Sequence, residues 1–556
     1  MEIGYIGLGA MGGALARRLL DRHSLTVWDM NADAVKHLVA LGASAAATAA
    51  EVGRKADIVF LCLPRSSDVR GALFGPEGLA RTLAPGKLVI DQTTGVPSET
   101  RVFAQELAAR EIGLLDAPVA GGVPNALAGT VTIMASGPRR HYDHALPVLK
   151  DMSPKVFFCG ERVGSGQASK LINNSINSGY RIATLEIAAL AAKLGLSLRA
   201  TNDVLTNGWA NNFTAFRLFS SLLRDQPSTD FALALMLKDV NQAIALGLDN
   251  RAPMPIAGIV RGVMQIGLNG ADPRASLDII VEVVETMAGA RLKAPSVESA
   301  DPARPFALRD IGVVLAGLPT EALPAGFAAL RRLDAEEMER PDLPPIVVDF
   351  TRRSYEDHRR LTADLARRGV ARLDATTANA PGAHADATTA HFVGGSDVAF
   401  ASLRAAFESS DCKAIHCGAA GTGEVARLVA NAVAACNRAV VYENAAVGLK
   451  AGLDPEAMAL VLNEGSGWSA EGKSILAALT SDAATTTAPL GAVADDLRAL
   501  LHLAIAHGAP LLIAAEVLAQ HAAEEALSGP NATLDALKRR YEAAAGIRFA
   551  DYAQNG

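Results

Sequence analysis

The sequence lacks the features that mark disulfide-rich, metal-binding and membrane-spanning proteins. Its 556 residues contain only five cysteines, with no CxxC pair and no His/Cys spacing that suits zinc. This excludes a disulfide framework and a structural metal site. No apolar run reaches the about 18 residues that cross a bilayer. Residues 1–6 already have a strand pattern with no basic leader before them. We therefore expect a soluble, cytoplasmic protein without a metal ion.

Aromatic residues are few, and positive charge is not in excess. Aromatic side chains make up 5% of the chain, and 52 basic residues face 59 acidic ones, for a net charge of -7. This balance argues against nucleic acid or a membrane surface as a partner. With 50% hydrophobic and 20% charged residues the composition is that of a globular protein. A chain of this length exceeds a single core, so we expect several domains.

The first thirty residues have the pattern of a dinucleotide-binding unit. An apolar strand at 3–6 leads into Gly7-Leu8-Gly9-Ala10-Met11-Gly12, and a helical stretch and a second strand follow, ending at Asp29. In such a loop the first glycine allows the turn, the second lets backbone approach the pyrophosphate, and the third lets the helix pack closely. A carboxylate at Asp29 accepts bonds from the ribose and repels a 2′-phosphate, and no Arg follows it. NAD is therefore expected in preference to NADP.

The sheet is expected to continue through residues 56–64 and 88–94, where each strand ends in a polar or proline-containing loop. Ligands of doubly wound sheets bind at the carboxyl ends of the strands. We therefore expect Leu63, Pro64 and Thr94 to border the cofactor.

A polar stripe on a long apolar helix is the main catalytic candidate. The loop at 164–166 opens a predicted helix of about 30 residues, on which Lys170, Asn174 and Asn177 share one face. A buried lysine is rare unless it has a function. The alternative is a surface lysine whose aliphatic stem packs on the protein. Lys238 ends a second apolar stretch that begins at Phe231, which also fits an ordinary core helix.

The motifs GLGAMG, DAPVAGG, GxGxxxKxxxN and the KD of LMLKD follow one another in the order of a known family. Residues 3–290 resemble the β-hydroxyacid dehydrogenases, the group of 3-hydroxyisobutyrate dehydrogenase, tartronate semialdehyde reductase and 6-phosphogluconate dehydrogenase. The resemblance implies that Lys170 is the general acid/base and that Asn174 orients the substrate. It also implies that Lys238 lies beside the nicotinamide.

The resemblance further implies the walls of the substrate site. The segment Ala120-Gly121-Gly122 is expected to hold the substrate carboxylate, because its paired glycines offer backbone N–H groups. Ala120 stands where the family usually has Ser, so one hydroxyl is missing. Trp209 and Phe231 are expected to line the pocket, although aromatic side chains on helices are also common in cores.

The expected chemistry needs a neutral lysine. Lys170 must take the proton of the C3 hydroxyl while hydride leaves, and burial or a neighbouring cation such as Lys238 lowers an amine pKa from about 10.4. Asn173 and Asn177 replace the His and Glu of 6-phosphogluconate dehydrogenases, which argues against decarboxylation. Related imine reductases usually lack this lysine, so its presence favours alcohol oxidation.

The second half of the chain repeats the first. Residues 347–351 correspond to residues 89–93 at an offset of 258 residues. Residues 421–423 correspond to residues 164–166 at an offset of 257 residues. The glycine loop has no counterpart in the second half, because residues 310–319, near the start of that half, correspond to the strand near residue 58. Gly121-Gly122 becomes Asn379-Ala380, Lys238 becomes Asp495, and Lys170 becomes Arg427, which stays protonated. We therefore expect no second active site.

The predicted fold class is α/β. A doubly wound Rossmann-type sheet (1–163) precedes an all-α domain (164–294), a linker (295–308), a truncated Rossmann-like domain (309–420) and a second helical domain (421–556). The predicted function is NAD-dependent oxidation of a small 3-hydroxy acid, or the reverse reduction of a semialdehyde, in the first half only. An NADP-dependent semialdehyde reductase and a non-catalytic NAD sensor are alternatives.

Three roles are open for the second copy. It is a built-in partner that packs against the first half as in a dimer, a tolerated duplication, or a unit that binds a regulator. Further homo-oligomerisation is compatible with each.

Overall fold

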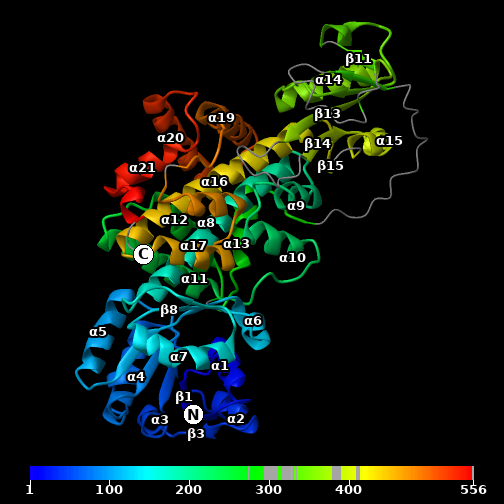
Figure 1. Ribbon diagram of the computed structural model, residues 1–556. Helices are drawn as coiled ribbons and strands as arrows, with labels where there is room; N and C mark the ends of the chain where they lie inside the picture. The colour runs from blue at the N-terminus through cyan, green and yellow to red at the C-terminus, as the bar shows by residue number, and fades with distance from the viewer. Residues whose placement is uncertain are drawn as a thin grey trace.

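The protein has two sheet-containing parts at opposite ends of a central body of helices (Figure 1). The computed structural model describes residues 1–272, 274–293, 311–314, 327, 331–333, 335–378, 390–408, 413–481 and 483–553. The predicted linker at 295–308 lies outside the described residues, as does the pair Asn379-Ala380. Within the described chain, no helix is long and apolar enough to cross a bilayer.

The first part is a parallel six-stranded sheet in the order β3-β2-β1-β4-β5-β6. Its strands are β1 (Glu2–Ile6), β2 (Ser24–Trp28), β3 (Ser44–Ala45), β4 (Ile58–Leu61), β5 (Leu88–Asp91) and β6 (Gly113–Asp116). The helices around it are α1 (Ala10–Leu19), α2 (Ala32–Ala40), α3 (Ala49–Lys55), α4 (Ser66–Phe74), η1 (Leu79–Arg81) and α5 (Pro97–Ala108).

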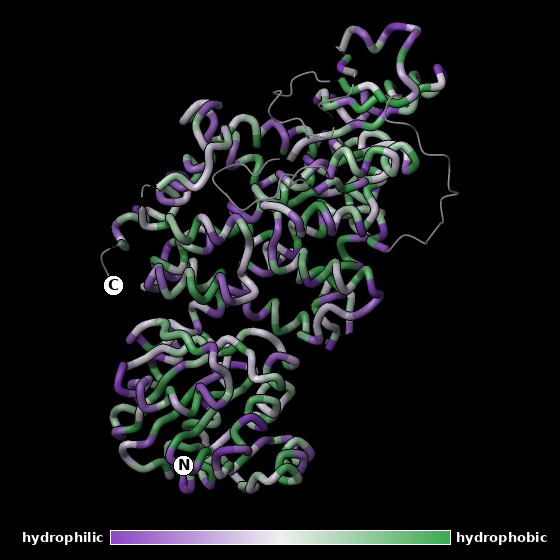
Figure 2. The backbone as a smooth tube through the Cα atoms, turned by 45° about the vertical axis from the view of Figure 1, so that its right-hand side comes forward, coloured by the Kyte–Doolittle hydropathy of each residue, from purple (hydrophilic) through white to green (hydrophobic). Residues whose placement is uncertain are grey.

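Side chains of this sheet alternate between two apolar layers. Ile58 and Phe60 of β4 pack in one layer, while Val59 and Leu61 pack in the other. Successive strand residues point to opposite faces, so a strand that is apolar throughout is buried on both sides. In Figure 2 the hydrophobic stretches run through the interior of this part, and the hydrophilic ones lie mostly on its outer loops. The predicted doubly wound sheet is confirmed.

A small sheet connects this part to the helical body. It contains β7 (Val119–Ala120), β8 (Thr132–Ala135) and β9 (Val156–Phe158), with α6 (Gly122–Ala128) and α7 (Arg139–Met152) between them. The first set of helices then follows: α8 (Ser165–Lys193), α9 (Leu198–Thr206), η2 (Ala215–Phe219), α10 (Ser220–Leu222), α11 (Leu233–Asp249), α12 (Pro255–Gly270) and α13 (Ile279–Ala288).

The second sheet has the order β11-β10-β12-β13-β14-β15. Its elements are β10 (Ile311–Val314), β11 (Arg331–Leu333), η6 (Ala335–Glu339), β12 (Ile346–Asp349), α14 (Tyr355–Arg367), β13 (Ala371–Ala378), β14 (Ala390–Gly395), α15 (Asp397–Phe407) and β15 (Lys413–Gly418). β11 pairs with β10 as β1 pairs with β4, yet it follows β10 in the chain. A later segment thus takes the place of the first strand, which the sequence pattern did not predict.

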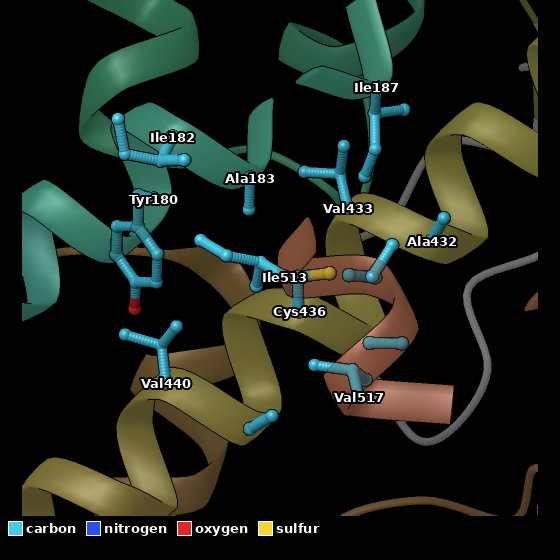
Figure 3. Packing of buried hydrophobic residues seen from close by; sticks show 14 of the residues in the cluster. Tyr180, Ile182, Ala183, Ile187, Ala432, Val433, Cys436, Val440, Ile513 and Val517 are labelled. Carbon is cyan, nitrogen blue, oxygen red and sulfur yellow. The ribbon is translucent and has the colours of Figure 1, made fainter. Parts of the chain in front are cut away.

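The second set of helices mirrors the first. It contains α16 (Thr422–Lys450), α17 (Pro455–Glu464), α18 (Ala470–Ala477), α19 (Leu490–Ala506), α20 (Leu512–Ser528), α21 (Ala536–Ala545) and η7 (Phe549–Tyr552). α8 and α16 have 29 residues each and pack against one another. Figure 3 shows their meeting surface, where Ala183 and Ile187 face Val433 and Cys436, with Ile513 of α20 alongside. Both sets share one continuous apolar core.

Contacts across this core come in pairs related by 257 residues. Glu186 accepts the N–H groups of residues 512–514 at the start of α20, and Glu443 accepts those of residues 256 and 257 at the start of α12. Lys193 donates to the carbonyl of Ala288, and Lys450 to that of Ala545. Such reciprocity is the geometry of a two-fold interface, here built inside one chain.

Candidate active site

The glycine loop after β1 leaves room for a ligand at one glycine only. A Cβ at Gly7, whose φ is +92°, would lie 2.3 Å from the carbonyl oxygen of Cys62, and one at Gly12 would lie 2.0 Å from that of Gly7. A Cβ at Gly9 would meet nothing within 4 Å. α1 starts at Ala10 with no side-chain cap and no acidic residue in its first turn. These residues fit a dinucleotide pyrophosphate, which needs free N–H groups and close approach to backbone.

Asp29 lies beside this loop at the end of β2. Its carboxylate accepts the backbone N–H of Leu8 at 2.6 Å and that of Asn31 at 2.7 Å. The carboxylate is therefore fixed in position at the mouth of the glycine loop. Each oxygen keeps a lone pair for a further donor, as recognition of a ribose requires.

Lys238 joins the helical body to the carboxyl edge of the first sheet. Its Nζ donates to the carbonyl of Pro64 at 3.1 Å and to that of Thr94 at 2.6 Å. The N–H of Leu63 is held by the Thr93 hydroxyl at 3.0 Å. Pro64, Thr94 and Lys238, predicted from three separate segments, are thus brought together in the structure.

Asp116 at the end of β6 sets the start of α8. Its carboxylate accepts the N–H of Gly164 at 2.6 Å, the N–H of Gln167 at 2.8 Å and the Ser136 hydroxyl at 2.5 Å. Burial raises the pKa of this carboxyl to about 6, although these bonds oppose the rise. The anchor fixes α8 against the sheet, and with it the lysine that follows one turn later.

Lys170, Asn174 and Asp239 form the polar centre of the site. Asn174 donates from Nδ2 to Asp239 at 2.7 Å, and Asp239 also pairs with Lys238 at 3.0 Å. Among the residues that the structure describes, none lies within hydrogen-bond or salt-bridge distance of Nζ of Lys170. The amine of Lys170 is thus near a carboxylate and a second cation but bonded to neither.

The electrostatics of this centre favour a neutral amine. Removal from water lowers the pKa of Lys170, Asp239 raises it and Lys238 lowers it, and together they bring it to about 8. Burial raises the pKa of Asp239, while the two lysines pull it down. A lysine with a pKa near neutrality can both take and give a proton in water at ordinary pH.

The double glycine after β7 has a backbone conformation that residues other than glycine rarely adopt. Gly121 has φ +133° and Gly122 has φ +77°, and α6 starts at Gly122 without a side-chain cap. A Cβ at Gly122 would meet only Pro124 at 3.8 Å, so its solvent side is open. Ala120 is buried and packs in a small apolar cluster that includes Val461 of α17.

The two aromatic candidates both lie in or against the helical core. Phe231 precedes α11, which starts at Leu233, because Ala232 is extended and bridges to Ser276. It lies partly buried against the helical core, and its role in substrate binding stays a prediction. Trp209 is 4% exposed within that core.

The segment around Trp209 lies against the second half. Asn207 accepts a bond from Lys413 at 2.7 Å, and the Ala210 carbonyl accepts one from Asn437 at 3.2 Å. That Trp209 lines the substrate pocket stays a prediction. The corresponding loop of the second copy, residues 464–468, contacts the helix that carries Lys170.

That loop is the part of the site that the sequence reasoning missed. The carbonyl of Ser466 accepts a bond from Asn177 at 3.0 Å, and its hydroxyl accepts one from Asn173 at 2.8 Å. Glu464 pairs with Lys155 at 2.8 Å. The repeat offset could have indicated this loop, because residues 464–468 correspond to residues 207–211. Loops at a two-fold interface contact the opposite copy.

In the second half, ion pairs occupy the position that corresponds to the Lys170 centre. Arg427 pairs with Glu424 and, at 2.6 Å, with Asp496, and Asn431 donates to Asp496 at 2.6 Å. These acids raise the pKa of the Arg427 guanidinium further above its already high value. Arg427 therefore cannot exchange a proton, although the scaffold around it is kept.

Comparison with known proteins places the chain in a family. The family model described as the NAD binding domain of 6-phosphogluconate dehydrogenase matches residues 2–160. A second, described as NAD-binding of NADP-dependent 3-hydroxyisobutyrate dehydrogenase, matches residues 164–284 and again 421–539. A 3-hydroxyisobutyrate dehydrogenase of Pseudomonas aeruginosa is 32% identical over 286 residues, which make up 50% of this chain and 95% of that protein. The chain belongs to the β-hydroxyacid dehydrogenase family.

Other relatives agree on the class of reaction. A 3-sulfolactaldehyde reductase of Escherichia coli is 32% identical and covers 52% of this chain and 98% of its own length. An NAD-dependent L-serine dehydrogenase of Pseudomonas aeruginosa is 29% identical, with 52% and 99% covered. The protein is thus an NAD(P)-dependent oxidoreductase acting on CH–OH groups, as its motifs predicted. The double match of the helical family model supports the tandem repeat.

Proposed function

We propose that the protein interconverts a small 3-hydroxy acid and its semialdehyde with NAD, using Lys170 as the general acid/base. The observation that carries this proposal is the unbonded amine of Lys170, held beside Asn174, Asp239 and Lys238 with a pKa lowered to about 8. The nicotinamide, when bound, supplies the hydride acceptor or donor. Every other task falls to side chains and backbone of this chain.

Each part of the site has one role in the proposal. The N–H groups around Gly121 and Gly122 bind the substrate carboxylate, because no side chain caps the start of α6 at Gly122. Asn174 keeps one amide hydrogen for the substrate hydroxyl while the other bonds to Asp239. Lys170 takes the hydroxyl proton during oxidation and returns it during reduction. Lys238 holds the loops of Pro64 and Thr94 at the cofactor edge.

We infer a preference for NAD from Asp29. Its carboxylate is fixed at the mouth of the glycine loop, where a 2′-phosphate would place a second negative charge beside it. A ribose hydroxyl instead donates to it. The glycine loop, with free space at Gly9 alone, supports the same binding mode.

We propose that only the first half is catalytic and that the second is its built-in partner. The division that follows is a cofactor domain (1–163), a helical domain (164–294), a linker (295–308), a truncated sheet domain (309–420) and a second helical domain (421–556). Arg427 supports the loss of proton transfer in the second copy. The shared core and the reciprocal Glu186 and Glu443 contacts support a dimer-like role for it.

The test is reduction of NAD, followed at 340 nm, with a panel of 3-hydroxy acids. We expect turnover of at least one acid, and Lys170→Ala should abolish it while NADH binding, followed by fluorescence, is retained. Reduction of the matching semialdehyde by NADH shows which direction is favoured. Tight NAD binding without any turnover would instead identify a sensor and overturn the proposal.

A further inference from the structure

The second half reaches the catalytic helix through the loop Gly465–Trp468. The Ser466 hydroxyl accepts a bond from Nδ2 of Asn173 at 2.8 Å, and the N–H of Gly467 donates to Oδ1 of the same residue at 2.8 Å. Asn177, one turn further along α8, donates to the Ser466 carbonyl at 3.0 Å. Three bonds thus join this short loop to one face of α8.

Asn173 transmits this contact to the proposed substrate-binding residue. Its Nδ2 also donates to Oδ1 of Asn174 at 3.2 Å, and Nδ2 of Asn174 donates to Asp239 at 2.7 Å. Asn173 is 0% and Asn174 3% exposed, so water does not compete with these bonds. The Asn174 amide, which can otherwise flip, is held at both ends.

The loop has no spare room against Asn173. A Cβ at Gly465 would lie 2.5 Å from Oδ1 of Asn173, and one at Gly467 would lie 3.2 Å from it. Gly208, which stands 257 residues before Gly465, differs: a Cβ there would meet only the Val204 carbonyl at 3.9 Å. The tight fit exists only on the side of Lys170.

The same segment also borders the proposed carboxylate site. Val461 packs with Ala120 and Met134 in one apolar cluster, and the Thr132 hydroxyl donates to the Glu464 carbonyl at 3.3 Å. Residues 461–467 therefore contact both the strand that leads into this site and the helix that carries Lys170.

From this arrangement we propose that the degenerate half completes the active site of the first half, with Ser466 as a positioning residue for Asn174. This inference rests on the proposed function. The second copy has lost its own chemistry but keeps one loop that the first copy needs. The chain Ser466–Asn173–Asn174–Asp239 fixes the amide that faces the substrate, so its loss lowers turnover more than cofactor affinity.

The experiment compares Ser466→Ala, Ser466→Thr and Gly465→Ala with the matched control Gly208→Ala in the full chain. We expect kcat to fall about tenfold in Ser466→Ala, because a buried amide loses its partner. The KM for NAD should stay within about twofold, since no phosphate or ribose contact changes. Ser466→Thr keeps the hydroxyl and should restore kcat. Gly465→Ala should lower kcat as well, whereas Gly208→Ala should not.

A second readout does not depend on turnover. The pH profile of Lys170 acetylation by acetic anhydride, followed by mass spectrometry, reports the pKa of its amine. In Ser466→Ala the freed Asn174 bonds less firmly to Asp239, which raises the pKa of that carboxyl and leaves less negative charge beside Lys170. The inflection should therefore move to lower pH in Ser466→Ala and stay in place in Gly208→Ala. If the wild type oxidises no acid, the proposed function fails and this profile alone decides the inference. Unchanged kcat and unchanged labelling in Ser466→Ala, or equal losses in Gly208→Ala, would overturn it.

Discussion

The pH dependence of oxidation follows from the surroundings of Lys170. Burial and Lys238 lower the pKa of its amine from 10.5 to about 8. At pH 7.5 an amine with a pKa of about 8 is neutral in about a quarter of molecules, whereas the unshifted value leaves about one in a thousand. The structure thus raises the share of active base by about two orders of magnitude. Oxidation needs the neutral amine, so kcat/KM should rise about tenfold per pH unit below 8 and level off above it.

Two neighbouring substitutions should move this inflection in opposite directions. Lys238→Met removes a cation that lowers the pKa of Lys170, so the inflection should move to higher pH. Asp239→Asn removes a carboxylate that raises this pKa, so it should move to lower pH. The assay is initial-rate NADH formation between pH 6 and 11 with saturating NAD and subsaturating hydroxy acid, which gives kcat/KM. Reduction, which needs the protonated amine, should decline above pH 8. An inflection near 10.5 in the wild type, or shifts of the same sign in both variants, would refute this reasoning.

Three further predictions follow from other contacts. In Gly12→Ala the new Cβ would lie 2.0 Å from the Gly7 carbonyl oxygen, so NADH affinity measured by fluorescence should drop at least about tenfold; unchanged affinity would contradict the loop geometry. Asp29→Ser removes the charge beside the ribose, and the ratio of kcat/KM for NADP to that for NAD should rise roughly ten- to hundredfold. Burial raises the pKa of Glu186 to about 8. The folded state therefore holds a proton that the unfolded state loses near pH 4.5. The free energy of unfolding should thus fall between about pH 5 and 8 and level off above pH 8. Urea titrations check this, and Glu186→Gln should flatten the slope.

Much of the first half could be predicted because its signals are local. The glycine loop, the acid at position 29 and the helix after Gly164 each depend on residues close in sequence, and hydrophobic periodicity separates strands from helices. The meeting of Pro64, Thr94 and Lys238 was predictable through the family resemblance. The position of Phe231 was not, because its exclusion from α11 depends on a bridge from Ala232 to Ser276 far along the chain.

The parts that could not be predicted depend on contacts between the two halves. Nothing near Trp209 in sequence shows that its loop contacts α16, or that Ser466 takes the corresponding place beside Asn173. The strand β11 is a similar case, since three residues fill a sheet edge that the missing first strand left unpaired. Such features follow from tertiary packing, which a repeat offset suggests only once the two-fold relation is known.

The central claim is a single active site in the first half, and equivalent variants of the two halves test it most directly. NAD reduction at 340 nm would be measured for Lys170→Ala and Arg427→Ala with the best 3-hydroxy acid. The account predicts a loss of about 10²- to 10⁴-fold in kcat for Lys170→Ala. Arg427→Ala should keep its turnover but unfold more easily, because Glu424 and Asp496 lose their buried cation. Turnover that survives Lys170→Ala, or that disappears in a folded Arg427→Ala, would contradict it.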